Sequence, residues 1–501
     1  MSDCEVLICG LGPVGQLLAL LLGDLGVRTV AVDEAFEPYD LPRAAVTDDE
    51  VLRIFQAVGL DETILADTQI QPAVTYITSR GRRIDILRTE HGDLGQPPLV
   101  SINQPSMERT MVAALAQRGR VDMRWGHRLE VCDRAADHVT AWLRPVTGGR
   151  ATPLCARYLV GCDGGRSTVR SRLQIPFGGS TFAQRWLVVD ALVDRPIAKV
   201  PHPHFAGDTR RPMVSSPTSP GRHRWEWMVH PGEDPAPLLE PAHIRELMQP
   251  WIAGERAEIE RAVVYTFHAR TAARWRVGPV LLAGDAAHLM PPFAGQGFSS
   301  GARDAANLAW KLDAVLHGAP DRLLDTYEAE RRPHATSMQK LAVRWGGVVQ
   351  TADPRLGALR DGALSLLDRS RVLEWTREHV KPLPTYCRGA FACAPHRLPF
   401  RRTVGALYPQ PERLDDRLGR GWAAVSLSPH AARVWRDADI HVVEPEADDW
   451  LSGHGAEWAL LRPDRFVFAC GGSAQLRPAL HALRSTVAAG LRSERPVAVA
   501  A

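Results

Sequence analysis

Residues 5–33, EVLICGLGPVGQLLALLLGDLGVRTVAVD, decide the fold because they have the pattern of a complete strand, turn, helix and strand. The apolar run at 5–9 predicts a strand, and GLGPVG at 10–15 predicts a glycine-rich turn that opens an apolar helix. The second strand, 28–32, ends at Asp33. Glycines at these spacings allow a tight turn and the close approach of a pyrophosphate, and the acid can bind both hydroxyls of a ribose. The stretch therefore predicts a Rossmann-like dinucleotide-binding domain.

A second stretch, LLAGDAAHLMPPFAGQGFSSGARDAANLAWKL at 281–312, places a strand, a ligand loop and a helix start in series. The strand ends at Gly284 and Asp285, where a carboxylate can hold a ribitol or ribose hydroxyl. A Pro-Pro turn and a glycine-rich turn then lead into a helix near Gly297, whose free amides favour negative charge. The first stretch alone does not separate NAD from FAD, but the two together predict a flavin.

A third element, CDGGRS at 162–167, follows a predicted strand at 157–161. Taken alone it has an ordinary alternative, because Asp, Gly and Ser are common where a strand passes into a helix. Its co-occurrence with the other two stretches favours a role of Asp163 at the cofactor.

Composition excludes several other classes of protein. The chain has 501 residues, enough for two or three domains, and its 60 basic and 57 acidic residues give a net charge of +3, which provides no reason to expect nucleic acid or a membrane as partner. The eight cysteines form no CxxC pair and no zinc-ligand spacing, so we expect no metal and a reducing compartment. The start MSDCEVLICG has no signal-peptide pattern, and the longest apolar run, 17–22, is too short to span a bilayer. A cytoplasmic protein is expected.

The three motifs, in this order, resemble the group A flavoprotein monooxygenases, the para-hydroxybenzoate hydroxylase-like single-component aromatic hydroxylases. The resemblance covers essentially the whole chain and is most similar to the 3-(3-hydroxyphenyl)propionate hydroxylase branch and its polyketide hydroxylase relatives. The further matching segments are LPRAAVTDDEVLRIFQAVGL at 41–60, INQPSMERTMVAAL at 102–115, WEWMVHPGE at 225–233, LLDTYEAERRPHA at 323–335 and LLRPDRFVFA at 460–469.

The resemblance implies an α/β fold of three parts. The predicted parts are a Rossmann-like FAD-binding domain with a helical region (1–75, 101–175 and 271–390), an inserted β-sheet substrate domain (76–100 and 176–270) and a thioredoxin-like C-terminal domain (395–501). The β-rich texture of 180–270 and the Pro- and Arg-rich loop at 394–411 agree with these boundaries. Because the C-terminal part has no CxxC, we expect it to be structural and available for contacts in a homodimer.

The resemblance also implies a set of FAD-binding residues. Those expected at the ADP half are Gly10, Gly12, Pro13, Val14, Gly15, Asp33 and Glu34; Arg43, Gln104 and Asp163 approach the cofactor; Gly284 and Asp285 hold the ribitol; and Pro292, Gly295, Gln296, Gly297, Phe298 and Ser299 surround the flavin ring. Pro292 is expected to border the flavin ring where substrate and dioxygen meet, Gly295 is expected to face the pyrimidine end of the ring, and these two are the candidate catalytic residues of the flavin-ring environment. Ser299 is a departure, because the family usually has Asn at that position, so a side-chain contact is expected to be weakened or replaced.

The implied activity is hydroxylation of a phenolic ring. NADH or NADPH reduces FAD, dioxygen gives a flavin C4a-hydroperoxide, and this electrophile attacks an electron-rich aromatic substrate. Only one complete GxGxxG occurs, which fits a reductant that binds transiently and argues against two-dinucleotide enzymes such as the disulfide reductases. The sequence does not distinguish NADH from NADPH.

The substrate is expected between the flavin and the inserted sheet. Candidate substrate residues are Arg211, His223, Trp225 and Trp227, most of them on the predicted strand at 223–230. Alternation places Arg224 and Glu226 on the face opposite the tryptophans, and either face could line the pocket, with sheet packing as the alternative for each residue. No general base is assigned.

Three other functions stay open. A monooxygenase of a large polycyclic polyketide or antibiotic phenol would share every flavin motif. A flavin-dependent halogenase is suggested by Trp225-Glu226-Trp227, which is similar to a WxW signature, but the Ile-Pro expected after it is absent, and we interpret the segment as a strand. A catalytically silent flavin-binding protein is the third, and it is disfavoured by intact motifs at three separate sites.

Overall fold

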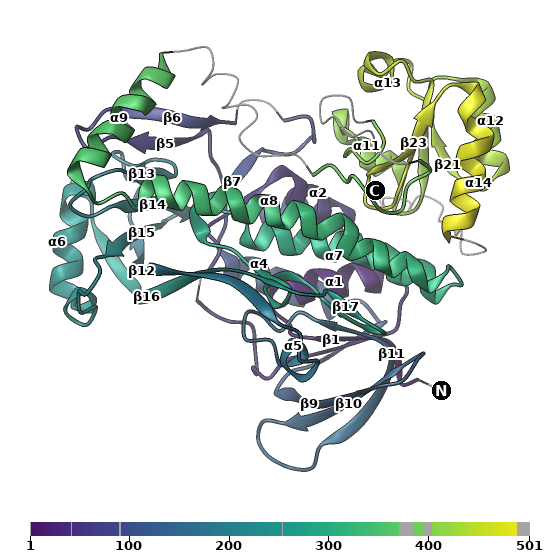
Figure 1. Ribbon diagram of the computed structural model, residues 1–501, viewed down its shortest axis with the longest axis horizontal. Helices are drawn as coiled ribbons and strands as arrows, with labels where there is room; N and C mark the ends of the chain where they lie inside the picture. Colours follow the sequence, from purple (N-terminus) through teal and green to yellow (C-terminus); the bar gives the residue numbers. More distant parts are fainter. Residues whose placement is uncertain are drawn as a thin grey trace.

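The computed structural model describes residues 2–41, 43–89, 92–252, 254–369, 384–393 and 403–487. The described residues form two large sheets, drawn toward the left and the lower right of Figure 1, and a smaller C-terminal sheet at the upper right. Helices α7 (Gly297–Leu316) and α8 (Asp325–Val349) run across the middle of that view. The expected start of the third part at residue 395 lies outside the described residues, as do residues 370–383 of the predicted helical region.

The glycine-rich turn directly follows strand β1 of the first large sheet. Its strand order is β17-β18-β11-β1-β2-β8, with β18, β11, β1, β2 and β8 parallel and with β10 and β9 extending it antiparallel. The bounds are β1 (Cys4–Cys9), β2 (Thr29–Val32), β8 (Val121–Arg124), β9 (His127–Arg134), β10 (Val139–Pro145), β11 (Thr152–Gly161), β17 (Arg276–Val277) and β18 (Val280–Leu282). Strand β1 is apolar and buried over Val6–Cys9, as is typical of strands in parallel sheets that are covered on both faces. The predicted strand, helix and strand at 5–33 are confirmed.

Helices α1 and α7 pack against each other beside this sheet. The bounds of the helices of this region are α1 (Pro13–Asp24), α2 (Asp49–Ala57), α3 (Asp61–Leu65), α4 (Gln104–Leu115), α5 (Thr168–Arg172) and α7 (Gly297–Leu316). Small residues on α7 permit the close approach: a Cβ added to Gly301 would lie 2.5 Å from a methyl group of Val14 on α1. A three-stranded sheet of β3 (Val46–Asp48), β7 (Leu99–Ser101) and β4 (Gln69–Ile70) lies next to α2.

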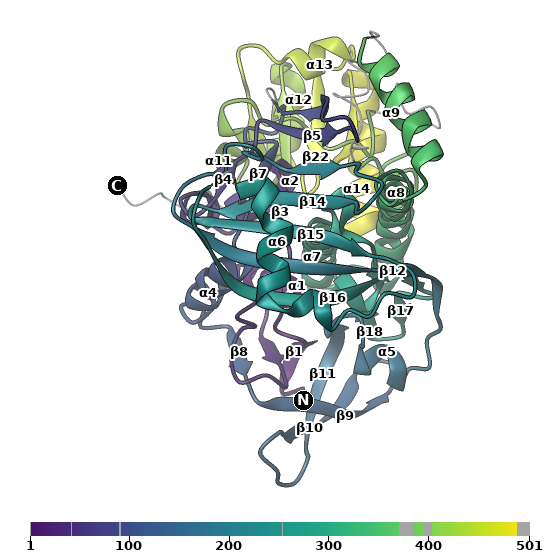
Figure 2. The same cartoon turned by 90° about the vertical axis from the view of Figure 1, so that its left-hand side faces the viewer.

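The second large sheet has the order β19-β16-β12-β15-β14-β13-β5-β6. Its bounds are β5 (Ala73–Ile77), β6 (Arg83–Arg88), β12 (Phe177–Val193), β13 (His204–Ala206), β14 (Met213–Ser219), β15 (Arg222–Val229), β16 (Ala257–Ala272) and β19 (His288–Leu289). Figure 2 shows α6 (Pro241–Ile252) lying across its outer face. β5 begins at Ala73, so residues 73–75, expected in the first part, pair in this sheet instead.

The last part of the chain forms a four-stranded sheet in the order β21-β20-β22-β23. Its elements are α11 (Leu414–Leu418), β20 (Ala423–Ser426), α12 (Pro429–Asp437), β21 (His441–Val443), α13 (Asp449–Gly453), β22 (Trp458–Leu461), β23 (Val467–Gly471) and α14 (Leu476–Val487). Long helices α8 (Asp325–Val349) and α9 (Pro354–Asp368) precede it. None of the helices in the described residues is long and apolar enough to cross a membrane.

A buried ion cluster joins the C-terminal part to α7 and α8. The Glu330 carboxylate accepts two hydrogen bonds from the Arg462 guanidinium, at 3.0 and 2.9 Å, and pairs with Lys311 Nζ at 2.9 Å. Asn307 also donates to Glu330, at 2.7 Å. Burial opposes ionisation of Glu330, but Arg462 and Lys311 lower its pKa to about 2. The cluster therefore joins α7, α8 and the end of β22, which are far apart in the sequence, through buried charged contacts.

Candidate functional site

A cavity of about 980 Å³ lies between the carboxyl ends of the first sheet and the inner face of the second. Its wall contains the glycine-rich turn, the Arg43 loop, the loop that leads into α7, and residues of α8. This volume is at the upper end of the range of ligand pockets. The three sequence motifs, more than 100 residues apart from one another, thus meet around one cavity.

The glycine-rich turn packs tightly against neighbouring backbone at Gly10 and Gly15 but faces open space at Gly12. A Cβ on Gly10, whose φ is +105°, would lie 2.4 Å from the Cys162 carbonyl oxygen, and one on Gly15 would lie 1.9 Å from the Gly10 carbonyl oxygen. A Cβ on Gly12 would meet no atom within 4 Å, and Gly12 lines the cavity. Gly10 and Gly15 therefore close the turn, whereas Gly12 leaves room for a ligand.

Asp33 holds this turn in place. Its carboxylate accepts hydrogen bonds from the Leu11 amide at 2.7 Å and from the Ala35 amide at 2.9 Å. Asp33 and Glu34 line the cavity, and each carboxylate oxygen has a further lone pair for a ribose hydroxyl.

Two helices begin at the cavity without a side-chain cap. Gly12, which has no side chain, precedes α1, and Gln296, whose side chain does not bond to the first-turn amides, precedes α7. Unpaired amides at a helix start bind phosphate or other negative charge. The α1 end suits a pyrophosphate and the α7 end suits the electron-rich pyrimidine side of a reduced flavin. These residues fit FAD.

Asp285 follows β18 and projects into the cavity. Desolvation by the surrounding protein raises its pKa, and His288 and Arg43 act in the opposite direction. The backbone before it is anchored by Asp304, which accepts from the Gly284 amide at 3.0 Å and from His288 Nε2 at 2.7 Å. Arg331 on α8 donates to the other oxygen of Asp304 at 2.9 Å. The contacts of Asp304 with His288 and Arg331 were not predicted from the sequence.

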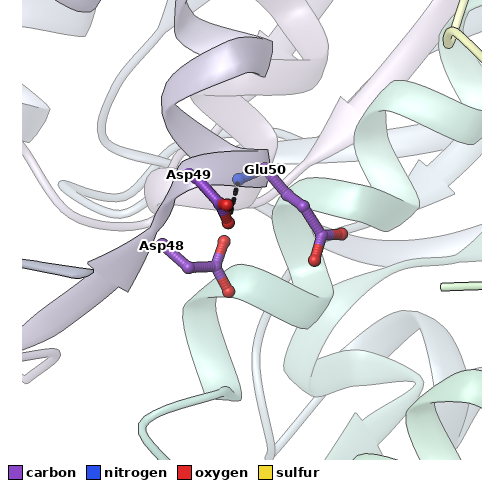
Figure 3. Close-up of side chains that lie close together, drawn as sticks. All are labelled: Asp48, Asp49 and Glu50. Carbon is purple, nitrogen blue, oxygen red and sulfur yellow. Dashed lines mark hydrogen bonds between the residues drawn. The ribbon is translucent and has the colours of Figure 1, made fainter. Parts of the chain in front are cut away.

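The loop before α7 is fixed by a second ion cluster, whose carboxylates Asp48 and Glu50 are drawn with Asp49 in Figure 3. Gln296 Nε2 donates to Asp48 at 3.0 Å, and the Arg303 guanidinium bonds to Asp48 and to Glu50, both at 2.6 Å. Oxygens of Asp48, Asp49 and Glu50 lie within 4.8 Å of one another. Because Arg303 already neutralises two of these carboxylates, we assign the cluster to the Arg303 pair rather than to a metal.

Glu108 lies beneath the cofactor loops and was not expected. Gln104 Nε2 donates to Glu108 at 2.6 Å while Gln104 Oε1 accepts from the Ala44 amide at 2.7 Å. Gln16 Nε2 reaches Glu108 at 3.3 Å and the Leu11 carbonyl at 2.7 Å. Burial raises the pKa of Glu108 to about 7, despite these hydrogen bonds. Its carboxyl group thus connects the Arg43 loop to the glycine-rich turn.

Replacing Glu108 by glutamine should flatten the pH dependence of stability. Glu108 binds its proton more tightly in the folded chain than in the unfolded one, so the free energy of unfolding falls as pH rises from about 4.5 to about 7. The expected fall is up to about 3 kcal/mol. Urea unfolding of the cofactor-free protein at several pH values measures it. An equal slope in Glu108→Gln and wild type would contradict the assignment.

The cavity brings together most of the expected cofactor residues. Those that line it are Gly10, Gly12, Pro13, Val14, Asp33, Glu34, Arg43, Gln104, Asp163, Asp285, Pro292, Gly295, Gln296, Gly297 and Phe298. Gly15, Gly284 and Ser299 lie behind the wall, and Ser299 contacts the Thr47 hydroxyl at 3.4 Å. Asp163 also caps α5 by accepting from the Val169 amide, which agrees with the ordinary alternative for this motif.

The four expected substrate residues do not line the cavity. Trp225 and Trp227 belong to the core beneath α6, and His223 bonds to the Ser215 hydroxyl at 2.6 Å. Arg211 pairs with Glu233 at 2.7 Å. The interpretation is corrected accordingly: α6 covers the tryptophan face of β15, so the opposite face of that strand, with Arg224 and Glu226, borders the cavity.

With this site in place, comparison with known proteins defines the class. Residues 3–342 match the model of the FAD binding domain family, and the chain belongs to that family. It is 36% identical to a 3-(3-hydroxy-phenyl)propionate/3-hydroxycinnamic acid hydroxylase of Mycobacterium sp. (strain JLS), over 93% of this chain and 89% of the relative. It is 35% identical to the enzyme of the same description from Escherichia coli O8 (strain IAI1), over 96% and 94% of the two chains.

Solved structures are similar over nearly the full length. The OxyS anhydrotetracycline hydroxylase from Streptomyces rimosus superposes with a TM-score of 0.78 at 26% identity, covering 97% of this chain and 99% of that one. Aklavinone-11 hydroxylase in a ternary complex with FAD and aklavinone gives a TM-score of 0.78 at 22% identity, with 97% and 99% coverage, and this likeness concerns the fold alone.

Proposed function

We propose that this protein is an FAD- and NAD(P)H-dependent monooxygenase that hydroxylates a phenolic aromatic ring. One observation supports this most directly: a single cavity connects the glycine-rich turn and two uncapped helix starts to an aromatic wall on the second sheet. The hydroxylases among the relatives match this chain over 93% and 97% of its length. In the proposed reaction, dioxygen and NADH or NADPH are the co-substrates.

The proposed cofactor position follows from the wall residues. Gly12, the α1 start and Asp33 would hold the ADP half, and Pro292 and the Gly295–Phe298 loop would border the flavin ring. FAD supplies two-electron transfer from the nicotinamide and the activation of dioxygen. The α7 amides stabilise negative charge at the flavin, while the polar network of Gln296 and Arg303 holds their loop rigid.

The substrate end of the proposed site is apolar. Phe267 and Phe293 meet edge to face with centroids 5.8 Å apart, and Phe205 stacks on Trp345 of α8 at 6.4 Å. All four rings line the cavity. Such a wall binds an aromatic ring and excludes water from the reacting centre.

A large polycyclic phenol is a second candidate substrate. The cavity volume of about 980 Å³ favours it, together with the similarity to a hydroxylase of anhydrotetracycline. The sequence relatives favour a small phenolic acid. For the C-terminal sheet we propose a thioredoxin-like, structural role, and homodimer formation stays a prediction.

The test is NADH and NADPH oxidation by the FAD-loaded protein with a panel of phenols. The panel contains 3-(3-hydroxyphenyl)propionate, 3-hydroxycinnamate, p-nitrophenol, anhydrotetracycline and aklavinone. We expect one ring class to accelerate oxidation and to give hydroxylated product in proportion to the nicotinamide consumed. Binding of FAD with peroxide as the sole product for every phenol would contradict the proposed activity.

A further inference from the structure

Strand β15 has two opposite faces, and its charged face borders the cavity. Arg224 and Glu226 line the cavity, whereas the tryptophans that alternate with them pack beneath α6. The cross-strand neighbours of Glu226 are Val188 on β12 and Val214 on β14, and both also line the cavity. The Glu226 carboxyl group, on a residue only 8% exposed, is therefore set into an apolar part of the wall.

The charges around Glu226 are arranged in a row across three strands. Arg224 bonds through two nitrogens to Asp190 on β12, at 2.7 and 3.2 Å, and lies 4.0 Å from Glu226. Arg261 on β16 approaches Asp190 at 3.8 Å and its guanidinium lies 5.3 Å from the Tyr265 ring centre. Asp190 is therefore the carboxylate that Arg224 contacts at hydrogen-bond distance, whereas the Glu226 carboxylate has one charge contact, at 4.0 Å, and accepts no hydrogen bond from the described residues.

A third partner of Arg224 comes from the other side of the cavity. Its guanidinium donates to the Arg43 carbonyl oxygen at 2.7 Å, which joins the second sheet to a loop of the FAD-binding region. The Arg43 side chain itself stacks on Tyr39, with 4.3 Å between the guanidinium carbon and the ring centre. Arg224 is thereby held at the junction of the two sheets, and Glu226 lies beside it.

Other carboxyl groups of the cavity wall have assigned partners or belong to the nucleotide end. Asp33 holds the glycine-rich turn, Asp48 binds Gln296 and Arg303, and Glu108 binds two glutamines. Among the described residues of the second sheet, Glu226 is the one carboxyl group that lines the cavity. Burial raises the pKa of Glu226, an effect that Arg224 opposes and Asp190 reinforces.

We propose that Glu226 is the catalytic base that accepts the proton of the substrate's ring hydroxyl. The inference rests on the proposed function and names a residue for its acid–base step. A carboxylate in an apolar wall, beside an aromatic pocket and with a free acceptor, is placed to receive a phenolic O–H. The guanidinium of Arg224 at 4.0 Å makes its negative charge tolerable there.

The proton transfer balances without any further reagent. The phenolic O–H bond breaks, an O–H bond forms on Glu226, and the electron pair left on the substrate oxygen increases the electron density of the ring. After oxygen transfer, the C–H bond at the hydroxylated carbon breaks and its proton passes to solvent, its electron pair restores the aromatic ring, and Glu226 returns its own proton to the ring oxygen. No oxidant or reductant is consumed in either step.

The test compares Glu226→Gln with wild type and with Glu246→Gln, a substitution on the exposed side of α6. Glutamine keeps the shape of the side chain and removes its basicity. With the best phenol of the panel, we expect kcat for hydroxylation to fall by about 10²- to 10⁴-fold. FAD affinity and the rate of flavin reduction by the nicotinamide should be unchanged. We expect wild-type kcat to decline at low pH as Glu226 becomes protonated, and this decline should be absent in Glu226→Gln.

The outcomes separate the inference from the function on which it rests. Full hydroxylation with a wild-type pH profile in Glu226→Gln overturns the role of Glu226 and leaves the proposed function intact. Loss of FAD binding in Glu226→Gln also overturns it, because the residue would then be structural. If wild type hydroxylates no phenol of the panel, the proposed function fails and the inference with it.

Discussion

Replacing Gly12 by alanine is expected to weaken FAD binding by about 10- to 100-fold without destabilising the cofactor-free protein. Gly12 has an extended backbone that alanine also adopts, with φ of −71°, and its added Cβ would touch no protein atom within 4 Å. The methyl group would instead occupy space in the cavity at the start of α1, where the pyrophosphate is expected. Fluorescence titration of the apoprotein with FAD measures the effect.

Two further glycines serve as controls for this prediction. Gly119→Ala also places a methyl group in open space, but outside the cavity, and should bind FAD as wild type does. Gly10→Ala should fold poorly, because its Cβ would lie 2.4 Å from the Cys162 carbonyl oxygen at a φ of +105°. Wild-type FAD affinity in Gly12→Ala would place the cofactor elsewhere.

Replacing Glu330 by glutamine is expected to lower the free energy of unfolding by about 3–5 kcal/mol at pH 7. Arg462 and Lys311 are both buried and share this carboxylate, so its neutralisation leaves two buried cations with less compensation. Burial already lowers the pKa of Lys311 to about 8, even with Glu330 present. Urea unfolding, followed by tryptophan fluorescence, measures the loss.

The pH dependence of this loss has a defined direction. The pKa of Glu330 is about 2 in the folded chain, so its contribution is complete above about pH 4.5 and is lost as pH falls toward 2. Wild type and Glu330→Gln should therefore converge in stability under acid conditions. Glu260→Gln, in a surface pair with Arg222, should change stability by less than about 1 kcal/mol. Equal effects of the two substitutions would contradict the buried cluster.

The cofactor end of the site could be predicted from the sequence because its signals are local. The turn at Gly10 and Gly15 depends on residues a few positions apart, and Asp33 and Asp285 each follow a strand within the same segment. The residues that anchor these segments could not be predicted in this way. Asp304 meets Arg331 27 residues later, and Glu108 meets Gln16 92 residues away, so neither pair leaves a local pattern.

At the substrate end of the site, prediction from the sequence was limited for a different reason. Alternation along 223–230 separates Arg224 and Glu226 from Trp225 and Trp227, but it does not state which face is covered. That choice is made by α6, whose Ile244 and Met248 pack on the tryptophan face from a later part of the chain. The expectation for Trp225 and Trp227 therefore failed for a tertiary reason, while the strand itself was predicted.

The central claim is that this cavity uses FAD to insert one atom of dioxygen into a phenolic ring. Mass spectrometry of the product made under oxygen-18 gas tests it most directly, with the FAD-loaded protein, a nicotinamide and the best phenol of the panel. The account predicts a product heavier than the substrate by one oxygen atom, with the label taken from the gas and not from water. A product labelled from water, or formed equally well without FAD, would contradict it.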